Sequence, residues 1–371
     1  MKILFVTNLC PPYRVGIFEL LAKEYDIEFL FFSSQGEKYY DGKLCLGNFR
    51  GRYLGGFFIL PKIKINPELI SKLTFCDYSH AIISFWGSFP LLLSFIIARL
   101  RRKKIILWAW SWHHPNSLSY KLAFPLIKYA YQECNSIVAY GTHVKSFLIS
   151  MGIDERKIFI APQAQDNIKF DKTITPEEKL KLKQQLGIHK QRVILFVGRL
   201  VEEKGIHVLL DAFKGLEHKD LSLIFVGKGC LEGFIKACMV SDKRIIHRPY
   251  VQNEQLCVYY AIADIFVLPS VTTAKHKEPW GISVNEAMCQ GCAVVVSDAV
   301  GAAMGGLIKN NENGLVVKEG DVSALTNAMR VLLNNHIVFE SIRRNARESV
   351  KDWNYVNMVK GFEEALSFAG K

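Results

Sequence analysis

A chain of 371 residues that is 50% hydrophobic has room for about two to three domains and is too apolar to be disordered throughout. Its nine cysteines lack the spacing of a disulfide framework or a zinc site, so a reducing cytoplasm is the expected location. A net charge of +12 favours an anionic partner, but the chain carries no helix-turn-helix, zinc-finger or RNP motif, and we expect no nucleic acid.

Short apolar runs alternate with longer amphipathic ones from the first residues onward, a pattern typical of a parallel sheet covered by helices. In the first half of the chain it predicts strands at 3–6, 27–32, 81–85, 105–108 and 136–140. The first run is only four residues long, which is too short for the apolar core of a signal peptide. We interpret it instead as a strand that is buried on both faces.

The longest apolar region, residues 89–98, is followed by a basic cluster at 99–104. Ten residues cannot span a bilayer as a helix, so no transmembrane segment is expected. Residues 1–165 hold 20 Lys and Arg against 11 Asp and Glu, net +9, whereas the remainder holds 27 against 24, net +3. We therefore predict contact between 89–104 and an anionic membrane surface, peripherally on the inner face of the plasma membrane. A core helix with a solvated basic end explains this segment equally well.

The second half of the chain repeats the alternation, with strands expected at 193–197, 223–226, 265–268 and 293–297. A polar stretch at 163–191 separates the two series, which places the domain junction near residue 168. The predicted domains are residues 1–167, 168–348 and a C-terminal helical segment, 349–371. The stretch 341–369 is expected to be helical, with a break at 352–354. The predicted fold class is α/β, with two doubly wound sheets.

Two loops of the second half carry cations or glycines directly after predicted strands. Gly198 and Arg199 follow the strand at 193–197, and Lys204 comes five residues later. Gly198 permits close approach of a ligand to the backbone, while Arg199 can bind a diphosphate in a fork and Lys204 adds a point charge. Gly227 belongs to a second turn, a Gly-x-Gly without the third glycine, which is weak evidence by itself.

The most informative stretch runs from Glu278 to Glu286 and reads Glu-Pro-Trp-Gly-Ile-Ser-Val-Asn-Glu. It follows a predicted strand, turns at Gly281 and enters a predicted helix. A helix N-terminus offers unpaired N–H groups and partial positive charge, which suits phosphate. One carboxylate before the turn and one after it suit a nucleoside diphosphate that bears hydroxyl groups at both ends. Two glutamates eight positions apart are common by chance, so the spacing alone is weak.

This segment resembles the Glu-x7-Glu signature of the retaining glycosyltransferases of family 4, and the resemblance continues through Ala287 and Met288 to Val294. It covers most of 190–330 and is much weaker over 1–165. Ala293 departs from the family pattern, which usually has proline there. The resemblance implies the GT-B fold, with two Rossmann-like domains facing across a cleft and a final helix, near Trp353, that crosses back to the N-terminal domain.

The resemblance also implies roles for residues of the second half. Glu278 would hold hydroxyls of the donor sugar and Glu286 the ribose, while Arg199 and Lys204 would stabilise the leaving diphosphate. The implied co-substrate is a UDP- or GDP-linked sugar, with no other cofactor. The chain has no Asp-x-Asp triplet, so no metal is expected. The remaining predicted donor contacts are Gly198, Gly227, Val251, Gly281, Ile282 and Ser283.

In the first half the resemblance implies a donor-phosphate contact at Gly16, although the family's Gly-rich loop is otherwise missing. His113 is the predicted histidine that approaches the donor sugar, with His114 as its rival, and Thr142 would line the cleft. The expected acceptor is a glycan, a glycolipid or a small molecule. Two alternatives stay open: a sugar-nucleotide epimerase of similar two-domain fold, and a non-catalytic partner subunit of a glycosyltransferase.

Overall fold

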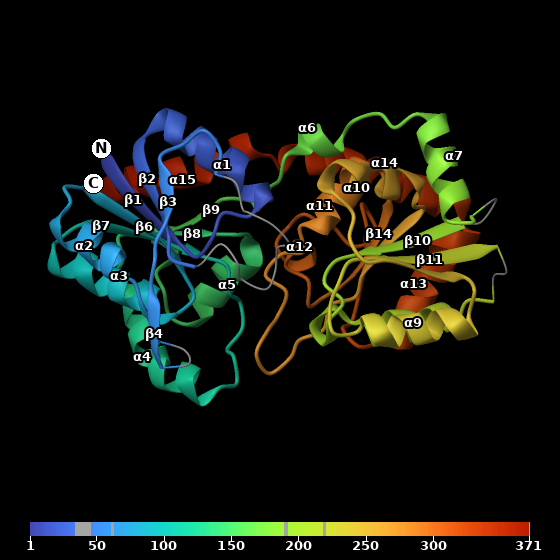
Figure 1. Ribbon diagram of the computed structural model, residues 1–371, viewed down its shortest axis with the longest axis horizontal. Helices are drawn as coiled ribbons and strands as arrows, with labels where there is room; N and C mark the ends of the chain where they lie inside the picture. The colour runs from blue at the N-terminus through green and yellow to red at the C-terminus, as the bar shows by residue number, and fades with distance from the viewer. Residues whose placement is uncertain (34–45, 61–62, 189–191, 218–219, 371) are drawn as a thin grey trace. The chain divides into compact units, whose positions relative to one another are not determined.

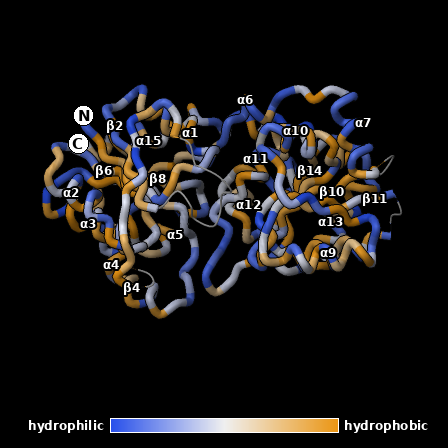
Figure 2. The backbone as a smooth tube through the Cα atoms, in the orientation of Figure 1, coloured by the Kyte–Doolittle hydropathy of each residue, from blue (hydrophilic) through white to orange (hydrophobic). Residues whose placement is uncertain are grey.

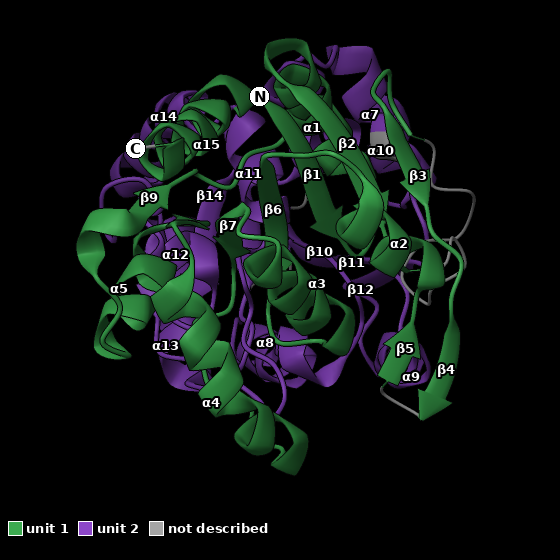
Figure 3. Cartoon of the chain, turned by 90° about the vertical axis from the view of Figure 1, so that its left-hand side faces the viewer, with its two compact units in different colours: residues 1–165, 355–371 green, residues 166–354 purple. Residues whose placement is uncertain are grey.

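The computed structural model describes residues 1–33, 46–60, 63–188, 192–217 and 220–370, drawn as ribbons in Figure 1. The chain forms two compact units, shown in different colours in Figure 3. Unit 1 comprises residues 1–165 and 355–371, and unit 2 comprises 166–354. Each unit contains a parallel sheet with helices, which confirms the predicted α/β class. The strands in the middle of each unit are rich in hydrophobic residues (Figure 2).

The sheet of unit 1 has seven parallel strands in the order β3-β2-β1-β6-β7-β8-β9. The five predicted strands are all present, shifted at their ends by one residue at most. The sequence pattern missed two strands of three residues each, because so short a run has no readable period. The strands are β1 (Lys2–Thr7), β2 (Asp26–Phe31), β3 (Gly51–Tyr53), β6 (His80–Phe85), β7 (Lys104–Ala109), β8 (Ser136–Ala139) and β9 (Ile158–Ile160).

The helices of unit 1 include one from the far end of the chain. The last helix packs on the first helix and on the final three strands of this sheet, where the Ser136 hydroxyl donates to the Ala365 carbonyl at 2.7 Å. This contact confirms the expected return of the C-terminal helix. The helices are α1 (Pro12–Glu24), α2 (Pro67–Phe75), α3 (Phe89–Leu100), α4 (Leu118–Glu133), α5 (Thr142–Ser150), the 3-10 turn η1 (Glu155–Lys157) and α15 (Tyr355–Gly370).

The apolar segment at 89–98 forms α3 and is a core helix. Leu91, Phe95 and Ala98 are fully buried against the sheet. Arg99 forms an ion pair with Glu133 at the basic end of the helix. Most apolar side chains that we expected to contact a membrane therefore face the protein interior, as a core helix requires, although Ile96 and Leu100 are exposed. Within the described residues, no helix combines the length and the apolar character needed to cross a bilayer.

A second, two-stranded antiparallel sheet stands apart from the main sheet of unit 1. It consists of β4 (Phe57–Leu60) and β5 (Ile63–Ile65). All four side chains of β4 are exposed, although every one of them is apolar. This pair of strands was not predicted from the sequence.

The sheet of unit 2 has six parallel strands in the order β12-β11-β10-β13-β14-β15. The first strand of the unit is central, and the chain reverses its direction of growth beside it, as in the doubly wound dinucleotide-binding fold. Ala293 opens β14 and donates its N–H to the Asp264 carbonyl at 3.0 Å, a bond that proline could not make. The strands are β10 (Arg192–Val197), β11 (Leu221–Val226), β12 (Ile245–Arg248), β13 (Ile265–Leu268), β14 (Ala293–Ser297) and β15 (Leu315–Val317).

The last helical segment of unit 2 ends at the break that was predicted at 352–354. Trp353 follows η3 and precedes α15, so the helical stretch at the end of the chain is interrupted where expected. The helices and 3-10 turns are α6 (Asn167–Phe170), α7 (Pro176–Gln185), η2 (Glu202–Lys204), α8 (Ile206–Lys214), α9 (Glu232–Ser241), α10 (Asn253–Ile262), α11 (Ser283–Cys289), α12 (Gly301–Met304), α13 (Val322–Asn334), α14 (His336–Ser349) and η3 (Val350–Asp352).

Candidate functional site

The topological switch point of unit 2 lies between β10 and β13, because the strand order grows in opposite directions from these two neighbours. Ligands of open parallel sheets bind at the carboxyl ends of strands beside such a point. The loop after β10 carries Arg199 and Lys204, and the loop after β13 carries Ser270 and Glu278. The predicted cations and the first predicted carboxylate therefore meet at the edge where a ligand is expected.

Lys204 and Glu278 form a buried ion pair across this switch point. The Ser270 hydroxyl lies 3.4 Å from the same carboxylate oxygen, to which it donates. Burial by itself would raise the pKa of Glu278, but the charge and the hydrogen bond of Lys204 hold that pKa below its usual value. The Glu278 carboxylate is therefore ionised at neutral pH.

Backbone contacts fix the two loops against each other. Gly205 has φ +68°, and a Cβ there would lie 1.9 Å from the Pro269 carbonyl oxygen, so only glycine fits after Lys204. The Val271 N–H donates to the Glu203 carbonyl at 3.0 Å. The position of the Lys204 ammonium group is thus set by close packing between backbones, which explains the need for a Lys-Gly sequence at this point.

Arg199 lies in the same loop but has a partner that the sequence analysis did not assign. Its guanidinium is 3.3 Å from the Glu203 carboxylate, four residues further on.

His276 is another residue of this site that was not singled out from the sequence. Burial lowers its pKa, and its electrostatic neighbours include Glu278 and Lys204. Its position two residues before Glu278 could have identified His276 from the sequence as a candidate site residue.

The turn between the two predicted carboxylates is held by packing on both sides. Gly281 has φ +87°, and a Cβ there would lie 2.6 Å from Leu268 of β13. The Trp280 indole N–H donates to the Asn285 side-chain oxygen at 2.8 Å, and its ring stacks on Trp353 with 5.0 Å between centroids. Ile282 and Ser283 follow this turn at the start of α11. Trp353 therefore supports the motif from within unit 2.

Glu286 lies in α11, as predicted, and differs from Glu278 in its electrostatics. Burial raises the pKa of Glu286 to about 7, and the Tyr260 hydroxyl, which donates to its carboxylate at 2.6 Å, offsets only part of that rise. Tyr260 belongs to α10 and was not singled out from the sequence. Near neutral pH the Glu286 carboxyl therefore exchanges between its protonated and ionised forms, whereas Glu278 is a fixed anion.

The other predicted donor contacts of unit 2 lie along the same edge of the sheet. The loop of Gly198 and the loop of Gly227 run side by side, joined by the Leu200 N–H, which donates to the Lys228 carbonyl at 2.8 Å. Val251 is buried after β12, next to the exposed Tyr250, whose ring lies 5.7 Å from the Lys228 ammonium. Tyr250 is a further exposed aromatic surface at this edge.

In unit 1 the two predicted histidines follow β7, and His114 packs among aromatic rings. The His114 ring contacts Phe124 and Phe147, with centroids 5.0 and 4.9 Å apart, and one ring nitrogen lies 3.1 Å from the Tyr120 hydroxyl. Burial lowers the pKa of His114. This packing gives His114 a structural function, so His113 stays the predicted donor contact.

Gly16 lies inside α1 and not in a loop. A Cβ there would approach the Tyr355 ring to 2.4 Å, so packing against α15 already accounts for the glycine, and its phosphate contact stays a prediction. Thr142 opens α5, directly after β8. Arg14, which was not singled out from the sequence, is a buried cation. Its guanidinium lies 4.6 Å from the Trp108 ring and donates to the Tyr140 hydroxyl.

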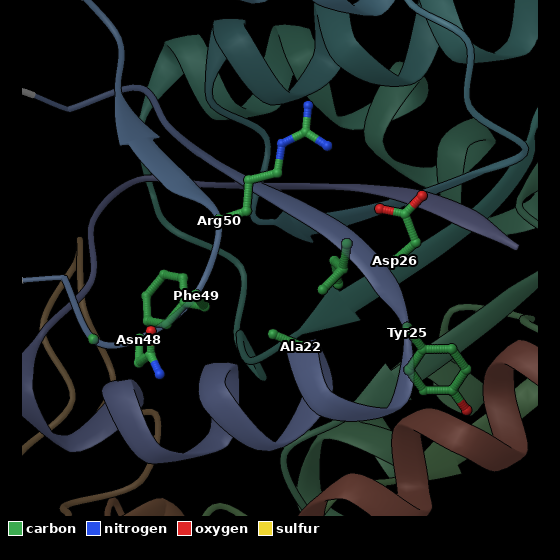
Figure 4. A pocket seen from close by; sticks show the side chains of 8 residues that line it. Ala22, Tyr25, Asp26, Asn48, Phe49 and Arg50 are labelled. Carbon is green, nitrogen blue, oxygen red and sulfur yellow. The ribbon is translucent and has the colours of Figure 1, made fainter.

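A pocket of about 420 Å³ in unit 1 lies away from these residues. Figure 4 shows Tyr25 and Asp26, where β2 begins, together with Asn48, Phe49 and Arg50, which precede β3. The pocket is therefore at the amino ends of these strands, opposite the edge where parallel sheets bind ligands. It contributes nothing to the candidate site.

Residues 178–349 match the family model of glycosyl transferases group 1. The chain is 29% identical over 236 residues to the uncharacterized glycosyltransferase MJ1607 of Methanocaldococcus jannaschii, covering 62% of this chain and 59% of the relative. It is 26% identical over 224 residues to the capsular polysaccharide biosynthesis glycosyltransferase CapM of Staphylococcus aureus, covering 58% and 57%. The matches thus span somewhat more than half of these two curated relatives.

Solved structures resemble the whole chain in fold. Anabaena HepE in complex with UDP superposes with a TM-score of 0.79 at 19% identity, covering 99% of this chain and 100% of HepE. WaaG, a glycosyltransferase involved in lipopolysaccharide biosynthesis, superposes with a TM-score of 0.72 at 15% identity, covering all of both chains. At these identities the likeness concerns the fold, and it confirms the predicted GT-B class.

Proposed function

Because residues 178–349 match the family model of glycosyl transferases group 1, we propose that the chain is a retaining glycosyltransferase. It moves a sugar from a nucleoside-diphosphate sugar to an acceptor hydroxyl. The observation that carries this proposal is the buried Lys204–Glu278 ion pair at the switch point of unit 2. A cation and a carboxylate fixed side by side suit the two parts of such a donor that meet at the reacting bond, the diphosphate and the sugar.

The chemical step that this proposal requires breaks the bond between the anomeric carbon and the diphosphate. Negative charge grows on the leaving diphosphate, and Lys204 and Arg199 stabilise it because they are held in place before the reaction begins. Glu278 accepts hydrogen bonds from hydroxyl groups of the transferred sugar. The acceptor hydroxyl attacks from the face that the diphosphate leaves, a departing phosphate oxygen takes its proton, and the anomeric configuration is retained.

In the same proposal the nucleoside of the donor binds further along the carboxyl edge of the unit 2 sheet. Glu286 accepts hydrogen bonds from the ribose, and Val251 lies where the base packs. HepE is solved with UDP and with UDP-glucose, and a GDP-mannose-dependent mannosyltransferase of Mycolicibacterium smegmatis is 22% identical over 345 residues. Both UDP- and GDP-sugars are therefore donor candidates. We propose that no divalent metal takes part, so turnover should persist in excess chelator.

The proposed acceptor is a glycan, glycolipid or small molecule in surface polysaccharide or glycolipid assembly. Relatives named for capsular polysaccharide, for amylovoran and for phosphatidyl-myo-inositol mannosylation support this class. Acceptor binding is assigned to unit 1, where His113 approaches the donor sugar. The proposal places the enzyme in the cytoplasm, where nucleotide sugars are available.

A thermal-shift screen against nucleotides and nucleotide sugars tests the donor assignment. A ligand at 100 times its dissociation constant stabilises the folded state by about 2.7 kcal/mol, which gives a measurable rise in melting temperature. One nucleoside diphosphate, with its sugar, should stand out from the rest. If none shifts the melting temperature, the non-catalytic subunit becomes the better explanation. Once the donor is known, the anomeric configuration of the product by NMR decides between retention and inversion.

A further inference from the structure

The β4 strand of unit 1 presents an unbroken apolar surface to solvent. Its four side chains, Phe57 to Leu60, are each between 57% and 62% exposed. Successive residues of a strand point to opposite faces, so both faces of β4 are apolar and exposed. A contiguous apolar surface of this kind is typical of an interaction site, whereas scattered exposed apolar residues are not.

The helix α4 carries a second exposed apolar surface. Leu118, Leu122, Leu126 and Tyr129 recur at intervals of four, four and three residues, which places them on one side of the helix, and all are exposed. The opposite side of α4, with Ile127, Ala130 and Tyr131, is buried in unit 1. This helix therefore has apolar residues on both sides, and core packing explains only one of them.

These two surfaces lie at the same edge of unit 1. Figures 1 and 3 view the chain from directions 90° apart, and in both of them β4 and α4 reach the lower edge of the unit. In Figure 3 they lie on either side of α3. Two separate projections at one edge can contact a broad flat surface at the same time.

The charge of the segments around β4 and α4 is one-sided. Residues 78–132, which include α4, contain no Asp or Glu and seven cations, namely Arg99, Arg101, Arg102, Lys103, Lys104, Lys121 and Lys128. Residues 42–67, which include β4, contain no Asp or Glu and five cations, namely Lys43, Arg50, Arg52, Lys62 and Lys64. Lys121 and Lys128 lie on α4 itself.

We propose that β4 and the outer face of α4 dock unit 1 on an anionic lipid bilayer. Apolar side chains would enter the interfacial region while Lys121 and Lys128 contact the headgroups. A second copy of this chain is a poorer partner, because each copy carries a net charge of +12 and would bring acid-free segments against each other. In this proposal the membrane contact moves from α3, most of whose apolar residues are buried, to β4 and α4.

Co-sedimentation of the full chain with lipid vesicles tests the proposal. The chain should bind vesicles that contain phosphatidylglycerol and not those of phosphatidylcholine alone, and added salt should weaken the binding by screening. Leu60→Ser in β4 and Leu122→Ser in α4 should each reduce binding at least about fivefold, because burial of a leucine side chain is lost. Lys121→Gln combined with Lys128→Gln should reduce binding by a similar factor or more.

Matched substitutions in unit 2 serve as controls. Leu180 of α7 is 57% exposed, as is Leu60, and Val240 of α9 is 75% exposed against 74% for Leu122. Leu180→Ser and Val240→Ser should leave vesicle binding unchanged. Melting temperatures of all variants check their folding, and the lysine variant keeps the test valid if a leucine variant fails to fold.

Three outcomes would overturn the proposal: no binding to either vesicle, binding that ignores lipid charge, or equal losses in the controls. Sedimentation equilibrium adds a fourth, in which the unsubstituted chain is a dimer that Leu60→Ser and Leu122→Ser dissociate, so that the surface belongs to a second copy. No donor or acceptor is present in these measurements. Their failure is therefore distinguishable from failure of the proposed transferase activity.

Discussion

The sheets of the two units have similar strand orders, but their carboxyl edges differ in chemistry. In each unit the first strand of the sheet has two strands on one side, with four on the other side in unit 1 and three in unit 2. The edge of unit 2 carries charged groups in pairs, with Lys204 beside Glu278 and Arg199 beside Glu203. The edge of unit 1 carries rings, with Trp86 and Trp110 at 5.4 Å and Trp112 and His143 at 5.0 Å between centroids.

This difference shows that the scaffold selects where a ligand binds, while the loops select what binds. Preorganised charges suit a diphosphate, which is small, charged and common to many donors. Aromatic rings with a few polar atoms suit sugars or lipid-linked acceptors, which are larger and vary between enzymes. The comparison also accounts for the uneven family resemblance, which is specific over 190–330 and weak over 1–165. Four predictions test this comparison, beginning with the largest expected effect on turnover.

Lys204→Met should have the largest effect. Loss of one preorganised charge is expected to lower kcat/KM by roughly 10²–10³-fold. The change also leaves Glu278 buried without its cation, which should lower the stability of unit 2 by about 3 kcal/mol. Initial rates and thermal melts measure the two effects. Lys204→Met combined with Glu278→Gln should recover the melting temperature but not the activity.

The matched control for that substitution is Lys214→Met, at an exposed lysine of α8 in the same unit. It should change neither the rate nor the melting temperature. Near-normal turnover of a folded Lys204→Met variant would remove the diphosphate role of unit 2, and with it the contrast between the two edges.

Glu278→Gln and Glu286→Gln should separate the roles of the two carboxylates. Glu278→Gln should impair turnover and leave nucleoside-diphosphate affinity nearly intact, because this residue is assigned to the sugar. Glu286→Gln should weaken the nucleoside diphosphate about 10- to 100-fold, since a hydrogen bond to a charged group contributes about 1.5–3 kcal/mol. Calorimetry with the free nucleotide, followed by initial rates with the donor, measures both. The reverse pattern would mean that the donor lies the other way round.

His113→Ala and His114→Ala should differ in the property that they change. Loss of one hydrogen bond of about 1 kcal/mol from His113 to the donor sugar should lower turnover roughly fivefold, with little change in melting temperature. His114 packs on aromatic rings, so His114→Ala should lower the melting temperature and leave the turnover of the folded enzyme nearly unchanged. An exchange of these two outcomes would identify His114 as the donor contact of unit 1.

The pH dependence of Glu286 is expected in stability and not in turnover. Because burial raises its pKa to about 7 in the folded chain, above the ordinary value for glutamate, the stability associated with its protonated form is complete at acidic pH and is lost as the pH rises through about 7. Glu286→Gln cannot ionise. Between pH 5 and 8 the melting temperature of Glu286→Gln should therefore rise relative to that of the unsubstituted chain by roughly 5–10 °C.

Thermal melts over that pH range, on the unsubstituted chain and on Glu286→Gln, measure the difference. Glu340→Gln, at an exposed position of α14, is the control and should show no such trend. A constant offset between Glu286→Gln and the unsubstituted chain would show that the environment of Glu286 does not raise its pKa.

Much of the fold could be predicted from the sequence, because strands that are buried on both faces must be apolar throughout. All nine predicted strands exist, and Ile265–Leu268 and Ala293–Ser297 even have the predicted bounds. The three-residue strands β3, β9 and β15 were not predicted, since their pairing depends on neighbours distant in the chain. The exposed apolar surface of β4 was not predicted either, because the sequence does not show which apolar residues become buried in the fold.

For the candidate site, the sequence by itself determined the residue types and their order along the chain. These residues are Arg199, Lys204 with the glycine that follows it, and the two glutamates on either side of the Gly281 turn. Their chemistry can be recognised from the sequence without knowledge of the fold. Only the tertiary structure decided their partners. Lys204 and Glu278 are 74 positions apart, and they meet because parallel pairing sets β10 beside β13. Likewise, burial raises the pKa of both carboxyl groups, but only Glu278 has a buried cation beside it that outweighs burial, so the pKa values of Glu278 and Glu286 move in opposite directions.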